Sequence, residues 1–168
     1  MKRIASFEKV SYDQFKEDVE GFGFEEDKIK YIYDNIALPK RATSESAGYD
    51  FYLPFDISIK PNEALVIPTG VRARITSSWV LMIFPKSGLG FKYQLALSNT
   101  VGIIDADYYN ANNEGHILIK LVNRSLNNAA ITLAKGKGFA QGIFLEYGIT
   151  MDDNADGART GGFGSTDK

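Results

Sequence analysis

The sequence predicts an all-β fold, a jelly-roll-like β-barrel preceded by a short helical N-terminal insertion. From about residue 48 onward, short runs rich in β-branched and aromatic residues alternate with proline, glycine and asparagine. No amphipathic segment of about 10–15 residues lies between these runs, which disfavours a parallel α/β architecture. Many short strands with even punctuation are typical of barrels and jelly rolls.

Two helical segments are expected first, at residues 11–20 and 25–35. Ser11 is suited to cap the first segment, and the second begins with an acidic turn. Apolar side chains lie on one face of each: Tyr12, Phe15 and Val19, then Ile29, Ile32, Tyr33 and Ile36. We expect the insertion, about residues 11–34, to dock on the barrel or on a neighbouring subunit. A solvated surface insertion without a function of its own is the alternative.

The strands follow in order, each bounded by turn residues such as Pro54, Pro61, Pro68 and Pro85. We expect them at 49–53, 64–67, 71–75, 80–84, 95–97, 116–122, 130–133 and 139–145. A chain of 168 residues suits one folded domain. We therefore expect a barrel over residues 1–158 and a glycine-rich arm over 159–168.

Composition excludes several function classes. A net charge of −2 provides no basic face for duplex or other stable nucleic-acid binding. The absence of cysteine excludes disulfides, thiolate metal sites and a cysteine nucleophile. The N-terminus turns acidic before any apolar run, and no segment approaches the ~18–20 apolar residues of a membrane span. We expect a cytoplasmic protein without a membrane partner.

The C-terminal stretch combines glycines with Arg159, Phe163, Gly164, Ser165 and Thr166. Backbone N–H groups, hydroxyls and a guanidinium bind phosphate, and an aromatic ring offers a face for a nucleobase. The stretch is therefore interpreted as a nucleotide clamp on a mobile arm. A disordered glycine-rich tail is the alternative.

Residues 102–109 place two carboxylates two positions apart after apolar neighbours. Asp105 is the candidate general base, because burial beside Ile103 and Ile104 would tune its pKa. An Asx turn that closes a hairpin is the structural alternative. Upstream, Asn99 has an amide suited to reading the amide edge of a ring, although asparagine is also common in plain turns.

After the strand at 80–84, the chain continues with Pro85, Lys86, Ser87 and Gly88. An ammonium, a hydroxyl and a flexible backbone suit phosphate oxygens. The segment lacks the spacing of a Walker A loop and we expect no helix after it, so a P-loop mechanism is not supported. A plain strand-to-loop turn is the alternative.

Three other polar residues are isolated among apolar or glycine neighbours. Asp50 is a turn former on its own, but beside a triphosphate it suits a magnesium ion held through water. Gln141, in the apolar run 139–144, needs a hydrogen-bond partner, and orienting a catalytic water is one way to provide it. His116 is the sole histidine, which excludes zinc and predicts a surface or packing role.

Taken in order, segments 47–50, 85–88, 102–108, 138–144 and 161–166 resemble the five-motif series of the trimeric dUTPase family. The resemblance extends over about residues 36–166. It implies a dUTPase-like β-clip and a homotrimer, in which each active site takes motifs from all three subunits and is closed by one C-terminal arm. The implied reaction is dUTP plus water to dUMP plus pyrophosphate with Mg²⁺, which keeps uracil out of DNA and supplies dUMP for thymidylate synthesis.

On the nucleoside side, the resemblance implies that Asp105 activates the attacking water and that Tyr108 packs under the deoxyribose, excluding a 2′-hydroxyl. It also implies that Asn99 and the backbone from Gly102 to Ile104 read uracil, with no room for a 5-methyl group or a cytosine amino group.

On the phosphate side, the resemblance assigns phosphate and water contacts to Lys86, Ser87, Gly88 and Gln141, and a water-mediated Mg²⁺ contact to Asp50. In the arm, the resemblance implies that Phe163 covers the uracil, that Arg159, Ser165 and Thr166 hold the γ-phosphate, and that Gly164 also binds the substrate.

The chain departs from the family pattern at four places. Lys86 replaces the usual arginine, residues 109–115 form a longer loop, and the spacing from Arg159 to Phe163 is one residue shorter. The N-terminal insertion, about residues 11–34, has no counterpart in compact members of the family. A non-catalytic dUTP-binding regulatory scaffold is an alternative. The presence of Asp105, Tyr108 and Gln141 together argues against it, because a scaffold would need neither a base, nor a sugar filter, nor a residue that holds water. A dCTP deaminase is a further alternative, and the core motifs contain no suitable glutamate for it.

Overall fold

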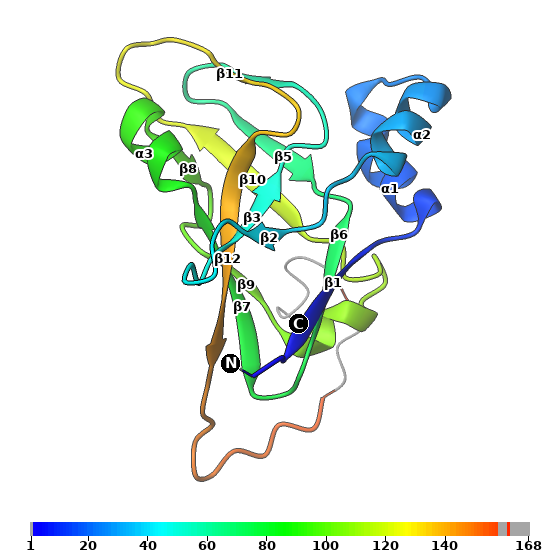
Figure 1. The fold of residues 1–168 in the computed structure, drawn as a ribbon, viewed down its shortest axis with the longest axis vertical. Coiled ribbons are helices and arrows are strands. Elements are labelled where there is room, and N and C mark those ends of the chain that lie inside the picture. Colours follow the sequence, from blue (N-terminus) through cyan, green and yellow to red (C-terminus); the bar gives the residue numbers. More distant parts are fainter. Residues whose placement is uncertain (1, 158–160, 162–168) are drawn as a thin grey trace.

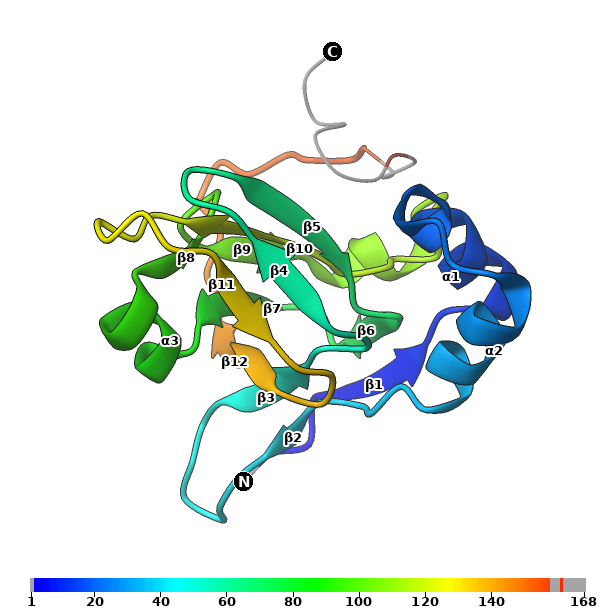
Figure 2. The same ribbon diagram turned by 90° about the horizontal axis from the view of Figure 1, so that it is seen from above.

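The computed structural model describes residues 2–157 and residue 161. The five arm residues Arg159, Phe163, Gly164, Ser165 and Thr166 lie outside the described residues. The described chain is mostly antiparallel β-sheet, with a helical unit at the N-terminal side and one short helix on the opposite side (Figures 1 and 2). No helix in residues 2–157 is long and apolar enough to cross a membrane.

The largest sheet has the strand order β2-β3-β12-β7-β9. Its strands are β2 (Lys40–Arg41), β3 (Tyr49–Tyr52), β7 (Trp79–Pro85), β9 (Gly102–Ile104) and β12 (Gly138–Glu146). A second sheet has the order β5-β10-β8, from β5 (Ala64–Pro68), β8 (Leu95–Leu97) and β10 (Leu118–Asn123). Two pairs complete the fold: β1 (Ala5–Lys9) with β6 (Val71–Ile75), and β4 (Ile57–Ile59) with β11 (Ile131–Leu133).

The all-β prediction is confirmed, although these sheets do not close into one continuous hydrogen-bonded barrel. They instead enclose a shared core, to which alternate residues of each strand contribute. In β7, Leu81 and Ile83 point inward and are almost fully buried. Gly142 of β12 is required beside them, because a Cβ there would lie 2.7 Å from Leu81 Cδ1 and 3.1 Å from Phe51 Cε2.

The strands expected from residue 49 onward all exist, and their ends agree with the predicted ends within two residues. The prediction did not include β1, β2, β4 or β9 as separate strands. These strands are short or, in β1, rich in polar residues, and they exist because β6, β3, β11 and β7 pair with them. Such pairing is non-local and leaves little local pattern.

The expectation that no helix follows Lys86 is wrong. Helix α3 (Ser87–Tyr93) begins immediately after it, and the carbonyl of Lys86 accepts from the N–H groups of Leu89 and Gly90. Two glycines in seven residues give this segment low helix propensity. Tertiary packing compensates, because Leu89 is buried against the sheets.

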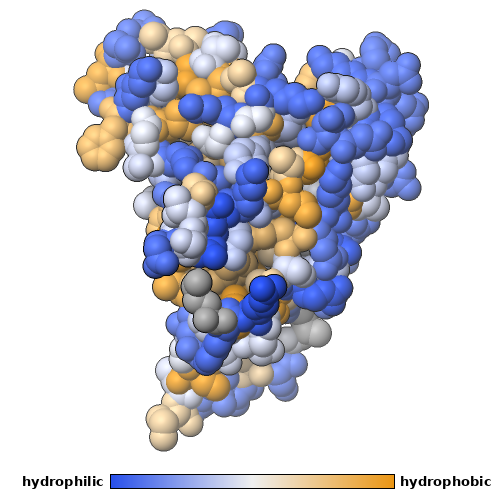
Figure 3. All heavy atoms as spheres, in the orientation of Figure 1, coloured by the Kyte–Doolittle hydropathy of each residue, from blue (hydrophilic) through white to orange (hydrophobic). Residues whose placement is uncertain are grey.

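Both N-terminal helices are present as expected. They are α1 (Tyr12–Val19) and α2 (Glu26–Asp34), joined by the 3-10 turn η1 (Glu20–Phe22). The hydroxyl of Ser11 caps α1 by accepting from the N–H of Gln14 at 3.1 Å. Phe15 and Val19 are fully buried, so this unit packs on the sheets, while its outer face is hydrophilic (Figure 3).

Candidate active site

One group of predicted site residues gathers where β3, β7 and β12 lie side by side. Lys86 Nζ lies 2.7 Å from Asp50 Oδ1, and Gln141 is the register partner of Asp50 on one side and of Phe84 on the other. Gln141 Nε2 donates to the carbonyl of Pro85 at 3.3 Å, which provides the expected partner. The structure thus brings together side chains from three separate sequence motifs.

Ser87 and Gly88 extend this group into the first turn of α3. Both residues are exposed, and Gly88 has open space around the position that a Cβ would occupy. Lys86, directly before them, is half-buried. An anion at this edge therefore has access to the ammonium and the serine hydroxyl without displacing packed side chains.

Asp50 is the carboxylate of this group, and Lys86 neutralises it. Burial raises the pKa of Tyr52, two residues after Asp50 in β3, and the charge of Asp50 raises it further. Within residues 2–157 and 161, no group of three or more His, Cys, Asp or Glu side chains is arranged to hold a metal ion. A single carboxylate fits Mg²⁺ that keeps several waters and takes its other ligands from phosphate.

A second group lines a cavity of about 340 Å³ beside β9. Asn99, Gly102 and Ile104 belong to its wall, which is otherwise mainly apolar: Val66, Ile83, Leu97, Ser98, Ile117, Leu118, Ile119 and Lys120. Gly102 fits tightly, because a Cβ there would lie 3.1 Å from the Cβ of Ile83. A mainly apolar cavity with one side-chain amide in its wall suits a flat heterocycle.

Asp105 and Tyr108 follow this cavity along the chain. Asp105 precedes the 3-10 helix η2 (Ala106–Asn110), and its carbonyl accepts from the N–H of Tyr108 at 3.2 Å. The expectation that Asp105 is buried beside Ile103 and Ile104 is wrong for the single chain, because Asp105 is exposed and Ile103 is 53% exposed. Tyr108, in contrast, is only 3% exposed.

Asp105 and the Lys86 group lie toward opposite ends of β7. Ile104 pairs with Leu81, which places Asp105 level with Val80. Lys86 is six residues beyond Val80, a separation of about 20 Å at about 3.3 Å per residue. Within one chain, Asp105 and the Lys86 group therefore do not meet.

Comparison with known proteins identifies the family to which this arrangement belongs. The dUTPase family model matches residues 34–167, most of the chain. The chain belongs to the dUTPase family. A deoxyuridine 5′-triphosphate nucleotidohydrolase of Lactococcus lactis subsp. lactis is 39% identical over 140 residues, covering 82% of this chain and 92% of that protein. The enzyme of the same description from Nautilia profundicola is 36% identical over 146 residues, covering 84% and 98%.

Solved structures of dUTPases share the fold. The crystal structure of the Streptococcus mutans dUTPase superimposes with a TM-score of 0.66 at 32% identity, covering 86% of this chain and 97% of that one. A dUTPase mutant of phage phi11 of S. aureus, which coordinates a structural Mg(II) ion, gives 0.66 at 18% identity, covering 92% and 98%. At that identity, the likeness to the phage protein concerns the fold alone.

Sequence reasoning missed the residues that support Tyr108. His116 is fully buried, so of its two expected roles the structure shows packing. It contacts Asp18 of α1 across 98 positions of sequence. An isolated histidine between Gly115 and the apolar run 117–119 was the available signal, but nothing in the local pattern pointed to Asp18.

Proposed function

We propose that the chain hydrolyses dUTP to dUMP and pyrophosphate, keeping uracil out of DNA and supplying dUMP for thymidylate synthesis in the cytoplasm. The observation that carries the proposal is the apolar cavity bounded by Asn99 and Gly102, with Asp105 and Tyr108 directly after it in a chain of the dUTPase family. In this proposal Asp105 holds and deprotonates the attacking water, and Tyr108 excludes a 2′-hydroxyl. Asn99 and the β9 backbone from Gly102 to Ile104 read uracil.

We propose further that the active sites are shared within a homotrimer. A base must lie within hydrogen-bond reach of the water that it activates, directly or through one further water. Asp105 is about 20 Å from Lys86 along β7, so one chain cannot present both to one triphosphate. A symmetric trimer solves this by placing Asp105 of one copy beside the Lys86, Ser87, Gly88 and Gln141 of another.

Magnesium fits the phosphate side of this site. Asp50 would hold the ion through its water shell, while Lys86 and Gln141 face the triphosphate and the water. When bound, Mg²⁺ neutralises phosphate charge that repels the attacking water. The arm residues Arg159, Phe163, Gly164, Ser165 and Thr166, outside the described part, are assigned the closing contacts by the family resemblance. Removing the chain from Arg159 onward should therefore abolish turnover.

Subunit complementation tests the shared site. Asp105→Asn and Lys86→Ala are each expected to be inactive, and their equimolar mixture, unfolded and refolded together, should recover activity. In a randomly assembled mixture, about half of the sites receive a subunit with an intact Asp105, and about half of those also receive a subunit with an intact Lys86. We therefore expect about a quarter of wild-type turnover. No recovery in verified mixed trimers would contradict the shared site, while inactivity of the wild-type chain on dUTP would contradict the reaction.

A further inference from the structure

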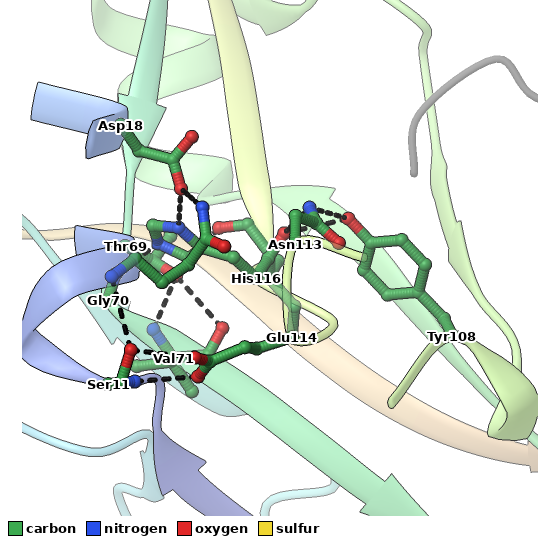
Figure 4. A network of polar contacts seen from close by, with 11 residues as sticks. Ser11, Asp18, Thr69, Gly70, Val71, Tyr108, Asn113, Glu114 and His116 are labelled. Atoms are coloured by element: carbon green, nitrogen blue, oxygen red, sulfur yellow. Dashed lines mark hydrogen bonds and ion pairs between the residues drawn. The ribbon is translucent and has the colours of Figure 1, made fainter. Parts of the chain in front are cut away.

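The hydroxyl of Tyr108 is hydrogen-bonded to a polar network whose other members lie outside the five sequence motifs (Figure 4). Its hydroxyl donates to the carbonyl of His116 at 2.8 Å and accepts from Asn113 Nδ2 at 2.8 Å. Both partners lie in the segment 111–116, the long loop after η2. The position of the Tyr108 ring therefore depends on how this loop is held.

The side chain of His116 joins the loop to the N-terminal helical unit. Its Nδ1 lies 2.5 Å from Asp18 Oδ2, and its Nε2 accepts from the N–H of Gly70 at 2.7 Å. Because a backbone N–H can only donate, Nε2 carries no proton and Nδ1 donates to Asp18. Gln14 Nε2 donates to the same carboxylate oxygen at 2.9 Å, so Asp18 is itself fixed.

A second contact holds the same loop to the start of α1. Glu114 accepts from the N–H and the hydroxyl of Ser11 at 2.7 and 2.6 Å. Glu114 has a φ of 56° and Gly115 a φ of 70°, and the left-handed conformation is unfavourable for a residue with a side chain. The N-terminal unit thus stabilises a loop conformation that is unfavourable for Glu114 alone.

We propose that Asp18, acting through His116 and the 111–116 loop, is a positioning residue for Tyr108 and thereby sets discrimination between deoxyribose and ribose. The inference rests on the proposed function, in which the Tyr108 ring is the wall that excludes a 2′-hydroxyl. The family model begins at residue 34, after α1, so this support comes from a segment outside the matched family core. The helical insertion accordingly acts on nucleotide selectivity.

The experiment compares dUTP with UTP as substrates of Asp18→Ala. We expect the ratio of kcat/KM for dUTP to that for UTP to fall about tenfold, equivalent to about 1.4 kcal/mol of discrimination. The ratio of dUTP to dTTP should stay unchanged, because base reading depends on Asn99 and β9. Asp18→Asn retains an oxygen that accepts from Nδ1 of His116, so it should restore most of the sugar discrimination.

Two controls separate positioning from general destabilisation. Glu26→Ala removes the same charge from the same helical unit and breaks only an exposed ion pair with Lys16, so its ratios should match wild type. In a Tyr108→Phe background the hydroxyl is already absent, so Asp18→Ala should produce little further loss of sugar discrimination.

An Asp18→Ala enzyme with the wild-type dUTP/UTP ratio, or one that loses dUTP and UTP turnover equally, would overturn the inference. Binding of dUMP against UMP, measured by calorimetry, provides the same sugar comparison without turnover. If the wild-type chain binds dUMP selectively but releases no pyrophosphate, the proposed function is wrong. The role of Asp18 in positioning Tyr108 is then still tested by the ratio of dUMP to UMP affinity in Asp18→Ala.

Discussion

Gly115, in the loop after Tyr108, has no room for a side chain. Its φ is 70°, and an added Cβ would lie 2.7 Å from both the carbonyl oxygen of Tyr108 and the Cα of Tyr109. Gly115→Ala therefore incurs the left-handed penalty of about 1–2 kcal/mol. It also adds an overpacking cost of about 1–3 kcal/mol, because both neighbours are backbone atoms that cannot rotate away.

Gly136→Ala is the matched control for this prediction. Gly136 has nearly the same φ, 76°, but nothing lies within 4 Å of its Cβ position. The two variants share the dihedral cost, so Gly115→Ala should be less stable by about 2 kcal/mol, seen as a melting temperature about 4–8 °C lower. Thermal unfolding followed by circular dichroism at one protein concentration measures this difference. Equal melting temperatures would refute the argument that the loop packs directly on the backbone of Tyr108 and Tyr109.

Three other predictions concern the site and its supports. Asp105→Asn should retain dUTP binding in calorimetry but lose turnover by about 10²–10⁴-fold, and near-normal turnover would remove Asp105 from the role of base. Asp50→Asn should raise the Mg²⁺ concentration for half-maximal turnover about tenfold, and an unchanged requirement would exclude Asp50 from the metal site. Burial alone would raise the pKa of Asp18, but hydrogen bonds from His116 and Gln14 outweigh it and leave that pKa below the ordinary 3.8. Ionised Asp18 therefore contributes fully to the stability of the folded chain above about pH 4, and this contribution is lost as the pH falls through the lowered pKa. Asp18→Asn should consequently reduce the dependence of the melting temperature on pH in the acid range.

Local patterns were sufficient to predict much of this fold. Residues 11–35 have helical periodicity and a capping serine, and strands such as β6 and β8 begin and end at the predicted positions. Helix α3 was missed because its glycines oppose helix formation in isolation, and the buried Leu89 decides the outcome only in the folded chain.

In the candidate site, too, the local motifs were predicted from the sequence and the long-range contacts between them were not. The motifs containing Asp50 and Lys86 were recognised from the sequence, but their ion pair was not, since it joins residues 36 positions apart. The link between His116 and Asp18 extends over 98 positions and depends on how α1 packs against the sheets. Long-range pairings of this kind follow from tertiary structure, which local spacing does not encode.

Hydrolysis of dUTP by this chain is best tested by measuring pyrophosphate release from dUTP, dTTP, dCTP and UTP, each with Mg²⁺ and again with EDTA. We expect rapid release from dUTP with Mg²⁺, little from the other three nucleotides, and loss of the activity in EDTA. Binding of dUTP without release of pyrophosphate from any nucleotide would show that the chain is not a dUTP hydrolase and would favour a regulatory dUTP-binding protein.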